Sequence, residues 1–215
     1  MPETDSYKTV RQVSYGQYKE KGSRFVAAIW PVSEEKEIRS VLEETRREHH
    51  EARHHCYAYL IGPDKGAWRA NDDGEPSGTA GRPILGQIRS SGLINVLIVV
   101  SRYFGGTLLG VSGLANAYKS AAHSAIANAE IVKRYVCESC DIVFPYAAMQ
   151  DVMKIIKDEN VEQSGHSFEL TCKMTIQFRR SARERILARL SRIEGCEYKM
   201  YSEGKGSDTD LKVVN

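Results

Sequence analysis

Side chains able to bind ions or move protons are concentrated between Asp72 and Tyr118, a segment that also holds nine of the seventeen glycines. At its start, Asp72, Asp73 and Glu75 place three carboxylates within four residues. Such a group could hold a hard cation or supply a general base. An Asp-Gly pair is also ordinary turn chemistry, and no later residue completes an EF-hand. We favour the turn and predict no bound metal.

A loop of small residues follows and leads into a predicted helix. Ser77, Thr79 and Arg82 lie in this loop, within the run Ser-Gly-Thr-Ala-Gly-Arg-Pro. Backbone N–H groups and a hydroxyl in such a loop can bind a phosphate, and Arg82 adds a positive charge. Neither the P-loop pattern nor the dinucleotide fingerprint is present. The alternatives are a small-anion site and a tight connection that packs the helix.

A third group ends the very apolar strand predicted at residues 95–101: Arg102, Tyr103, Phe104, Gly105 and Gly106. An arginine beside two aromatic rings can bind a phosphate and a stacked base. Alternation along the strand puts Arg102 and Phe104 on one face and Tyr103 on the other. In the alternative, Phe104 lies in the core and Arg102 bridges to a carboxylate such as Asp73.

Histidines cluster just before the acidic turn, at His49, His50, His54 and His55. Zinc needs three or four converging ligands, whereas His54 and His55 point to opposite faces of a strand. We therefore predict no zinc site and expect a histidine such as His55 to form hydrogen bonds near the glycine-rich loops.

A basic face is predicted on a helix in the second half of the chain. Arg185, Arg189 and Arg192 recur at i, i+4 and i+7, which makes them candidates for a nucleic-acid or ribosome contact. The alternative is a solvated face on which they pair with Glu184 and Glu194.

Strands and helices must position these residues, and their expected order indicates an α+β chain. We predict two domains, at residues 1–132 and 133–215. In the first, strands are expected at residues 9–13, 25–30, 55–61, 67–71 and 95–101, and helices at 33–49, 83–91 and 113–129. Ser33 and Ser112 are predicted helix caps, and residues 18–24 are a predicted polar loop.

The second domain has the element order β-α-β-β-α-β, which indicates a ferredoxin-like fold. Its elements are expected at residues 135–144, 146–159, 161–164, 168–178, 181–194 and 196–202. The polar tail at residues 203–215 is expected to fray.

Composition narrows the class of protein. With 30 basic and 28 acidic residues, the net charge of +2 does not by itself predict nucleic-acid binding. No apolar run is long enough to span a membrane, and the first residues do not form a secretory signal. The five cysteines are odd in number, which is typical of reduced thiols in the cytoplasm. We expect a cytoplasmic protein with no membrane partner and no cofactor.

Four motifs resemble the Impact family in its bacterial YigZ-type branch. They are KGSRF at residues 21–25, ARHHCYAY at 52–59, DDGEPSGTAGRPIL at 72–85, and NVLIVVSRYFGGTLLGVSGLANAY at 95–118. The resemblance implies a first domain with the β-α-β architecture of a small-subunit ribosomal protein and of elongation factor G domain IV. It implies a second domain similar to elongation factor G domain V.

The resemblance also implies a link to translation, since eukaryotic relatives restrain a translational stress kinase pathway through protein–protein contact. It adds Arg24, Asn116 and Tyr118 to the candidate binding residues. Where the family commonly has a glycine and a basic residue, this chain has Ser112 and Asn116. A ligand held by that basic residue would be bound more weakly or differently here.

The predicted function is translation-associated binding of RNA, the ribosome or a translation factor, without catalysis. The alternative is an enzyme that acts on a small phosphorylated or anionic substrate at the glycine-rich loops. In that case Asp72, Asp73 or Glu75 would serve as a base or a metal ligand.

Overall fold

The computed structural model describes residues 5–62, 66–167 and 169–201. The predicted frayed tail lies outside these residues. The chain divides into two compact units, one formed by residues 7–134 and the other by residues from 135 onward together with residues 5 and 6.

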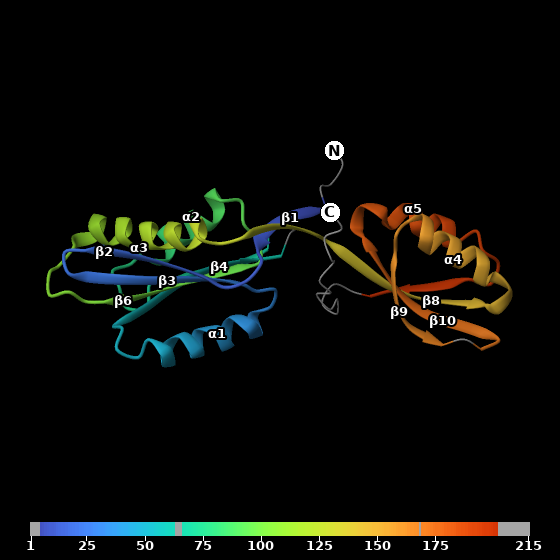
Figure 1. Ribbon diagram of the computed structural model, residues 1–215, viewed down its shortest axis with the longest axis horizontal. Coiled ribbons are helices and arrows are strands. Elements are labelled where there is room, and N and C mark those ends of the chain that lie inside the picture. Colours follow the sequence, from blue (N-terminus) through green and yellow to red (C-terminus); the bar gives the residue numbers. More distant parts are fainter. Residues whose placement is uncertain (1–4, 63–65, 168, 202–215) are drawn as a thin grey trace. The chain divides into compact units, whose positions relative to one another are not determined.

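The first unit is built on a five-stranded antiparallel sheet with the order β2-β3-β6-β4-β5. Its strands are β2 (Ser14–Glu20), β3 (Ser23–Pro31), β4 (His54–Ile61), β5 (Ala67–Asn71) and β6 (Val96–Tyr103). Helix α1 (Glu35–Glu48) covers one face, and α2 (Gly81–Ser90) and α3 (Gly110–Ala127) cover the other (Figure 1). Strands β1 (Ser6–Val10) and β7 (Ile131–Tyr135) form a separate two-stranded sheet.

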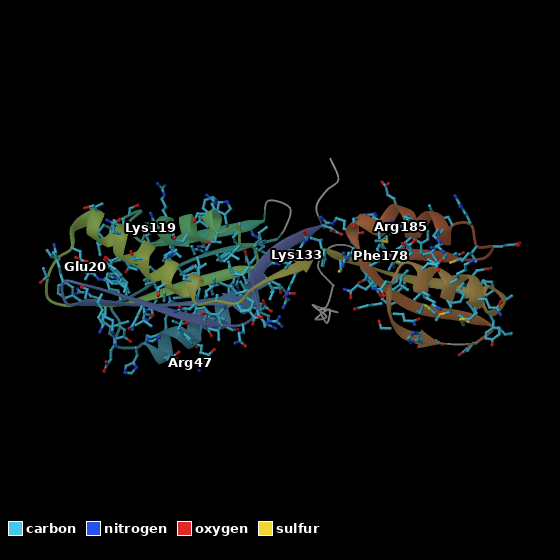
Figure 2. The ribbon with its side chains drawn as sticks, turned by 45° about the horizontal axis from the view of Figure 1, so that its top comes forward. Glu20, Arg47, Lys119, Lys133, Phe178 and Arg185 are labelled. Atoms are coloured by element: carbon cyan, nitrogen blue, oxygen red, sulfur yellow. The ribbon has the colours of Figure 1, made fainter. Side chains whose placement is uncertain are left out.

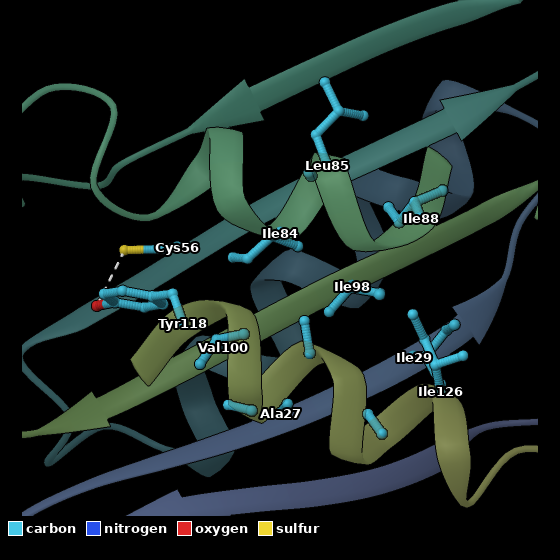
Figure 3. Packing of buried hydrophobic residues seen from close by; sticks show 14 of the residues in the cluster. Ala27, Ile29, Cys56, Ile84, Leu85, Ile88, Ile98, Val100, Tyr118 and Ile126 are labelled. Atoms are coloured by element: carbon cyan, nitrogen blue, oxygen red, sulfur yellow. Dashed lines mark hydrogen bonds between the residues drawn. The ribbon is translucent and has the colours of Figure 1, made fainter. Parts of the chain in front are cut away.

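Small residues let α3 lie close to the sheet. Ala117, Ala121 and Ala125 are fully buried in the main core, where α3 packs beside α2 and the central strands (Figure 3). Gly16 on β2 belongs to the same contact, because a Cβ there would lie 2.2 Å from the backbone nitrogen of Ala125. Only glycine allows this approach of strand and helix.

Helix α1 has a different core of its own on the opposite face. Its apolar stripe, with Ile38 and Leu42, packs on Tyr57 and Tyr59 of β4 and on Val99 of β6. A capping box opens the helix, in which Glu34 and Glu37 satisfy each other's backbone N–H groups. Ser33 is therefore not the cap that was predicted, and its hydroxyl instead donates to the Glu37 carboxylate.

Two further local predictions are wrong. Most of the predicted loop at residues 18–24 belongs to strands β2 and β3, and the turn is confined to Lys21 and Gly22, both with positive φ. Polar side chains on an edge strand concealed the alternation there. Helix α3 begins at Gly110 with Leu109 as its N-cap, so Ser112 lies inside the first turn.

The second unit is a four-stranded antiparallel sheet with the order β11-β8-β10-β9. Its elements are β8 (Cys137–Pro145), α4 (Met149–Asp158), β9 (Glu162–Ser167), β10 (Thr171–Arg179), α5 (Arg183–Leu190) and β11 (Glu197–Met200). One face of β8 and β10 forms a core with α4 and α5 that includes Ile142 and Ile176. The predicted α+β class and the ferredoxin-like order of this unit are confirmed.

Candidate nucleic-acid interface

The predicted site residues of the first unit gather at one end of its sheet, called here the β6 end. Strand β6 finishes there at Tyr103, opposite Arg24 of β3, and Arg102 lies opposite His54 at the start of β4. The β2–β3 turn lies against Gly105, just after β6, and the connection from β6 to α3 lies at the same end (Figure 1). The end of β5 lies opposite Tyr57 of β4 and next to the start of α2. Segments far apart in the sequence are thus brought together around one strand end.

Beneath this end lies a buried polar cluster centred on Glu75. One carboxylate oxygen, Oε1, accepts a hydrogen bond from the Arg102 guanidinium at 2.6 Å and another from the Tyr118 hydroxyl at 2.8 Å. The Arg102 and Glu75 side chains are 7% and 3% exposed. The Cys56 thiol lies 3.3 Å from the Tyr118 oxygen, as the dashed line in Figure 3 shows. Burial raises the pKa of both Cys56 and Tyr118, so the thiol stays protonated and is a poor nucleophile.

In this cluster Arg102 forms an ion pair of the kind that one of the two alternatives predicted. The guanidinium pairs with a carboxylate, but the partner is Glu75 and not Asp73. It also lies 5.5 Å from the ring centroid of Phe25 and 5.6 Å from that of Phe104. Phe104 is 45% exposed and therefore lies outside the core, contrary to that alternative. Arg102 is therefore a buried residue that contacts the exposed ring of Phe104.

The carboxylate of Asp72 closes the loop that precedes α2. It accepts hydrogen bonds of 2.8 to 2.9 Å from the backbone N–H groups of Gly78, Ala80 and Gly81. Burial raises the pKa of Asp72, but these three hydrogen bonds outweigh burial and hold the pKa below its ordinary value. The Thr79 hydroxyl donates to a carbonyl three residues before it, at 2.7 Å.

Of the two alternatives for this loop, the small-anion site is the less favoured, because Asp72 occupies the loop. The N–H groups that would bind an external phosphate already bind the Asp72 carboxylate. Asp72 therefore caps α2 although it lies 8 and 9 residues before the N–H groups of Ala80 and Gly81. Ser77 and Arg82 remain exposed on the surface of the loop. The tight connection that packs the helix, the other predicted alternative, describes this loop.

The remaining acidic residue, Asp73, belongs to a histidine network. Its carboxylate accepts the backbone N–H of His55 at 2.7 Å, and its carbonyl oxygen lies 2.8 Å from Nδ1 of His54. On the other face of β4, Nε2 of His55 lies 3.1 Å from the carbonyl oxygen of His49, and burial lowers the pKa of His55. Within the described part of the chain, no group of His, Cys, Asp and Glu side chains could hold a metal ion.

The exposed part of the β6 end is basic and aromatic. The Arg24 guanidinium lies 4.3 Å from the ring centroid of Tyr103, whose hydroxyl is 2.8 Å from Nδ1 of His49. Gly105 and Gly106 follow Phe104 and are exposed. A Cβ at Gly105 would lie 1.9 Å from the backbone of Gly22, so the loop is held against the β2–β3 turn. The exposed ring of Phe104 therefore precedes a backbone segment that is held in place by this contact.

The two positions that depart from the family pattern lie on the outside of α3. Ser112 and Asn116 are exposed, whereas Tyr118 on the same helix is fully buried. Asn116 thus belongs to the surface, and Tyr118 belongs to the Glu75 cluster.

Two of the three candidate arginines of the second unit are paired within that unit. Arg185 and Arg189 both bind the Glu159 carboxylate, at 2.6 and 3.0 Å, and Arg189 also binds Asp158 at 2.7 Å. The hydrogen bond from Arg185 lowers the pKa of Glu159. These partners lie at the C-terminal end of α4 and replace the predicted Glu184 and Glu194. Arg192 is exposed and lines a surface hollow with Lys154.

Sequence reasoning missed the contribution of β2 to the surface of the first unit. Tyr15, Gln17 and Lys19 are exposed along one face of this strand. Their alternation with Gly16 and Tyr18 was the available signal.

Comparison with known proteins places the first unit in a family. Residues 21–126 match the Impact N-terminal domain. The IMPACT family member YvyE of Bacillus subtilis is 38% identical over 129 residues, which cover 60% of this chain and 59% of that protein. The IMPACT family member YigZ of Escherichia coli is 42% identical over 108 residues, which cover 49% of this chain and 53% of that protein. The first unit therefore contains an Impact N-terminal domain, as the sequence motifs predicted, and the matches span little more than half the length of these relatives.

A solved structure described as a hypothetical protein has the same fold. It matches with a TM-score of 0.71 at 24% identity, over 93% of this chain and 99% of that one. Among the described residues, no helix is long and apolar enough to cross a membrane.

Proposed function

We propose that this protein acts in translation in the cytoplasm as a non-catalytic binding protein, and that it contacts RNA through the β6 end. The observations that carry the proposal are the Arg24 guanidinium stacked on Tyr103 and the half-exposed ring of Phe104, the next residue in the chain. Aromatic faces stack on unpaired bases, and a guanidinium pairs with a phosphate. The link to translation comes from the family resemblance.

The charge of Arg24 is available to such a ligand. Among the described residues, no carboxylate lies within ion-pair distance of its guanidinium. The neighbouring Arg102 is instead neutralised by Glu75. Arg24 is therefore the better residue to substitute in a test of binding, because loss of Arg102 would leave a buried carboxylate without its cation.

An enzyme acting on a small anion has less support from the same geometry. The N–H groups of the loop before α2 are occupied by Asp72, and burial keeps the Cys56 thiol protonated. Neither an anion cradle nor an activated nucleophile is present among these groups. Binding at the exposed surface is the function that the arrangement favours.

The test is fluorescence anisotropy of a labelled single-stranded RNA, and of purified ribosomal subunits, titrated with the full chain at several salt concentrations. We expect binding at low salt, and a loss of affinity of about fivefold or more in the Phe104→Ala variant. Arg24→Ala should also weaken binding and reduce the slope of log affinity against log salt by about 0.7.

The matched controls are Trp68→Ala and Arg89→Ala. These residues form a second exposed cation–aromatic pair, with the guanidinium 4.8 Å from the ring centroid, near the opposite end of β4 and β5. They should leave affinity within about twofold. Absence of any RNA or ribosome binding by the unaltered protein at low salt would overturn the proposal.

A further inference from the structure

Half of one face of the first sheet carries no helix. Helix α1 packs over β4 and β6, where its core contains Tyr57, Tyr59 and Val99. On the opposite face, α3 covers β2 and β3. The α1 side of β2, together with Arg24 of β3, is therefore exposed beside α1, whereas Ala28 of β3 on the same face is buried.

The side chains on this open face follow from the strand register. Tyr15 lies opposite Ala28, Gln17 opposite Val26, and Lys19 opposite Arg24. Alternation places these pairs on one face, while Gly16 and Tyr18 face α3. Tyr15 is 54% exposed, and Gln17, Lys19 and Arg24 are also exposed. We call the set of Tyr15, Gln17, Lys19, Arg24 and Tyr103 the β2 platform.

Two positive charges meet directly across the strands of this platform. Lys19 and Arg24 are cross-strand partners, and side chains in that relation have Cβ atoms about 4.5–5.5 Å apart. Among the described residues neither forms an ion pair, and the Glu20 carboxylate beside them accepts the Tyr18 hydroxyl. Like charges in this position destabilise a sheet. A phosphate bound between them would remove the repulsion and gain two charge-assisted hydrogen bonds.

Aromatic rings flank this pair of cations on both sides. Tyr15 lies four residues before Lys19, about 13 Å away along the strand. Tyr103 lies next to Arg24 on the adjacent strand, with the guanidinium over its ring. The Gln17 amide lies between Tyr15 and Lys19 and can both donate to and accept from a base edge. Stacking faces, an amide and a phosphate site in this order suit successive nucleotides of an extended strand.

We propose that the β2 platform binds a single strand of RNA, with a backbone phosphate between Lys19 and Arg24 and a base stacked on Tyr15. This binding mode rests on the RNA-binding function proposed above and extends it from the β6 end onto the open half of the sheet. The occupant is a single strand because stacking on an aromatic side chain requires an unpaired, accessible base.

The test compares Tyr15→Ala and Lys19→Ala with two controls in the full chain. Lys119→Ala removes an exposed cation on α3, and Figure 2 shows Lys119 and Arg47 of α1 on opposite sides of the sheet. Trp68→Ala removes an aromatic ring that is 55% exposed, near the far end of the sheet. Affinity is measured by anisotropy for a single-stranded RNA and for a duplex of the same length. Circular dichroism establishes that the variants fold, as the exposure of the substituted side chains predicts.

We expect Tyr15→Ala and Lys19→Ala each to weaken single-strand binding by about fivefold or more, with the controls within about twofold. The single strand should bind more tightly than the duplex, and 4-thiouridine in the RNA should cross-link to the peptide that contains Tyr15. If the unaltered protein binds RNA but neither β2 substitution changes the affinity, the β2 platform is overturned while binding at the β6 end stands. If the duplex binds as tightly as the single strand, the proposed occupant is wrong. If no RNA binds, both proposals fail.

Discussion

At the scale of single residues, Glu75 is the side chain on which the β6 end most depends. Its carboxylate is almost completely buried and is bound by a guanidinium and a phenol. Removing one partner of a buried ion pair leaves an uncompensated charge and costs about 3–5 kcal/mol. We expect Glu75→Ala to lower the free energy of unfolding of the first unit by about that amount, measured by urea denaturation followed by circular dichroism.

The control is the exposed ion pair of Glu130 with Arg11, in which the two side chains are 58% and 53% exposed. Solvent screens such a pair, so Glu130→Ala should cost less than about 1 kcal/mol. Equal losses in the two variants would mean that the buried cluster does not stabilise the fold.

The sequence identified the members of this cluster but could not pair them. Glu75, Arg102 and Tyr118 were all candidate residues, yet the partners of Glu75 lie 27 and 43 residues further along the chain. Spacing along a chain gives no distance between such positions. One alternative therefore named Asp73 as the partner of Arg102, two residues from the carboxylate that binds it. Both the ion pair and the role of Cys56 required the fold.

At the scale of elements, the start of α2 carries a prediction about pH. The pKa of Asp72 is depressed in the folded state, so its contribution to stability is present above the unfolded value of about 3.9 and is lost as pH falls through the folded value. Asp72→Asn keeps the shape and removes the charge. We expect it to lower the free energy of unfolding by about 1 kcal/mol at pH 7, and the difference from the unaltered protein to shrink towards pH 3. Urea denaturation at several pH values measures this, and a difference independent of pH would contradict it.

Two glycines of the first unit should respond in opposite ways to substitution by alanine. In Gly16→Ala the new Cβ would lie 2.2 Å from the backbone nitrogen of Ala125, so strand and helix must move apart. Such overpacking costs about 1–3 kcal/mol or more. Gly86 lies within α2 with nothing within 4 Å of an added Cβ. Gly86→Ala should therefore stabilise the unit by about 0.5–1 kcal/mol.

Thermal denaturation of both glycine variants tests this difference in sign. A Gly16→Ala protein that melts at or above the temperature of the unaltered protein would show that the strand and helix are not in close contact.

Sequence patterns found most of the helices and the apolar strands because these elements bury a clear stripe or run. They missed β2, since an edge strand with an open face carries polar residues on that face.

At the scale of the whole molecule, each unit has a core of its own, and the candidate ligand-binding groups differ between them. In the first unit, Lys19 and Arg24 lie together without a carboxylate partner among the described residues. In the second, Arg185 and Arg189 are held by Asp158 and Glu159. The ferredoxin-like order could be predicted from the sequence of element types alone, whereas the neutralisation of its basic helix could not, because the carboxylates come from a different element.

This difference predicts which unit carries the affinity for RNA. The charges of Arg185 and Arg189 are already offset by Glu159, whose side chain is 7% exposed, and by Asp158, which weakens their attraction for a phosphate. We expect the double variant Arg185→Ala/Arg189→Ala to retain RNA affinity within about twofold and to keep the salt dependence of the unaltered protein. In the double variant Lys19→Ala/Arg24→Ala, the slope of log affinity against log salt should fall by about one to two. Both pairs remove two positive charges, so a non-specific effect of net charge would weaken binding equally. A larger loss from the second-unit variant would place the RNA contact on α5 and overturn the assignment to the first unit.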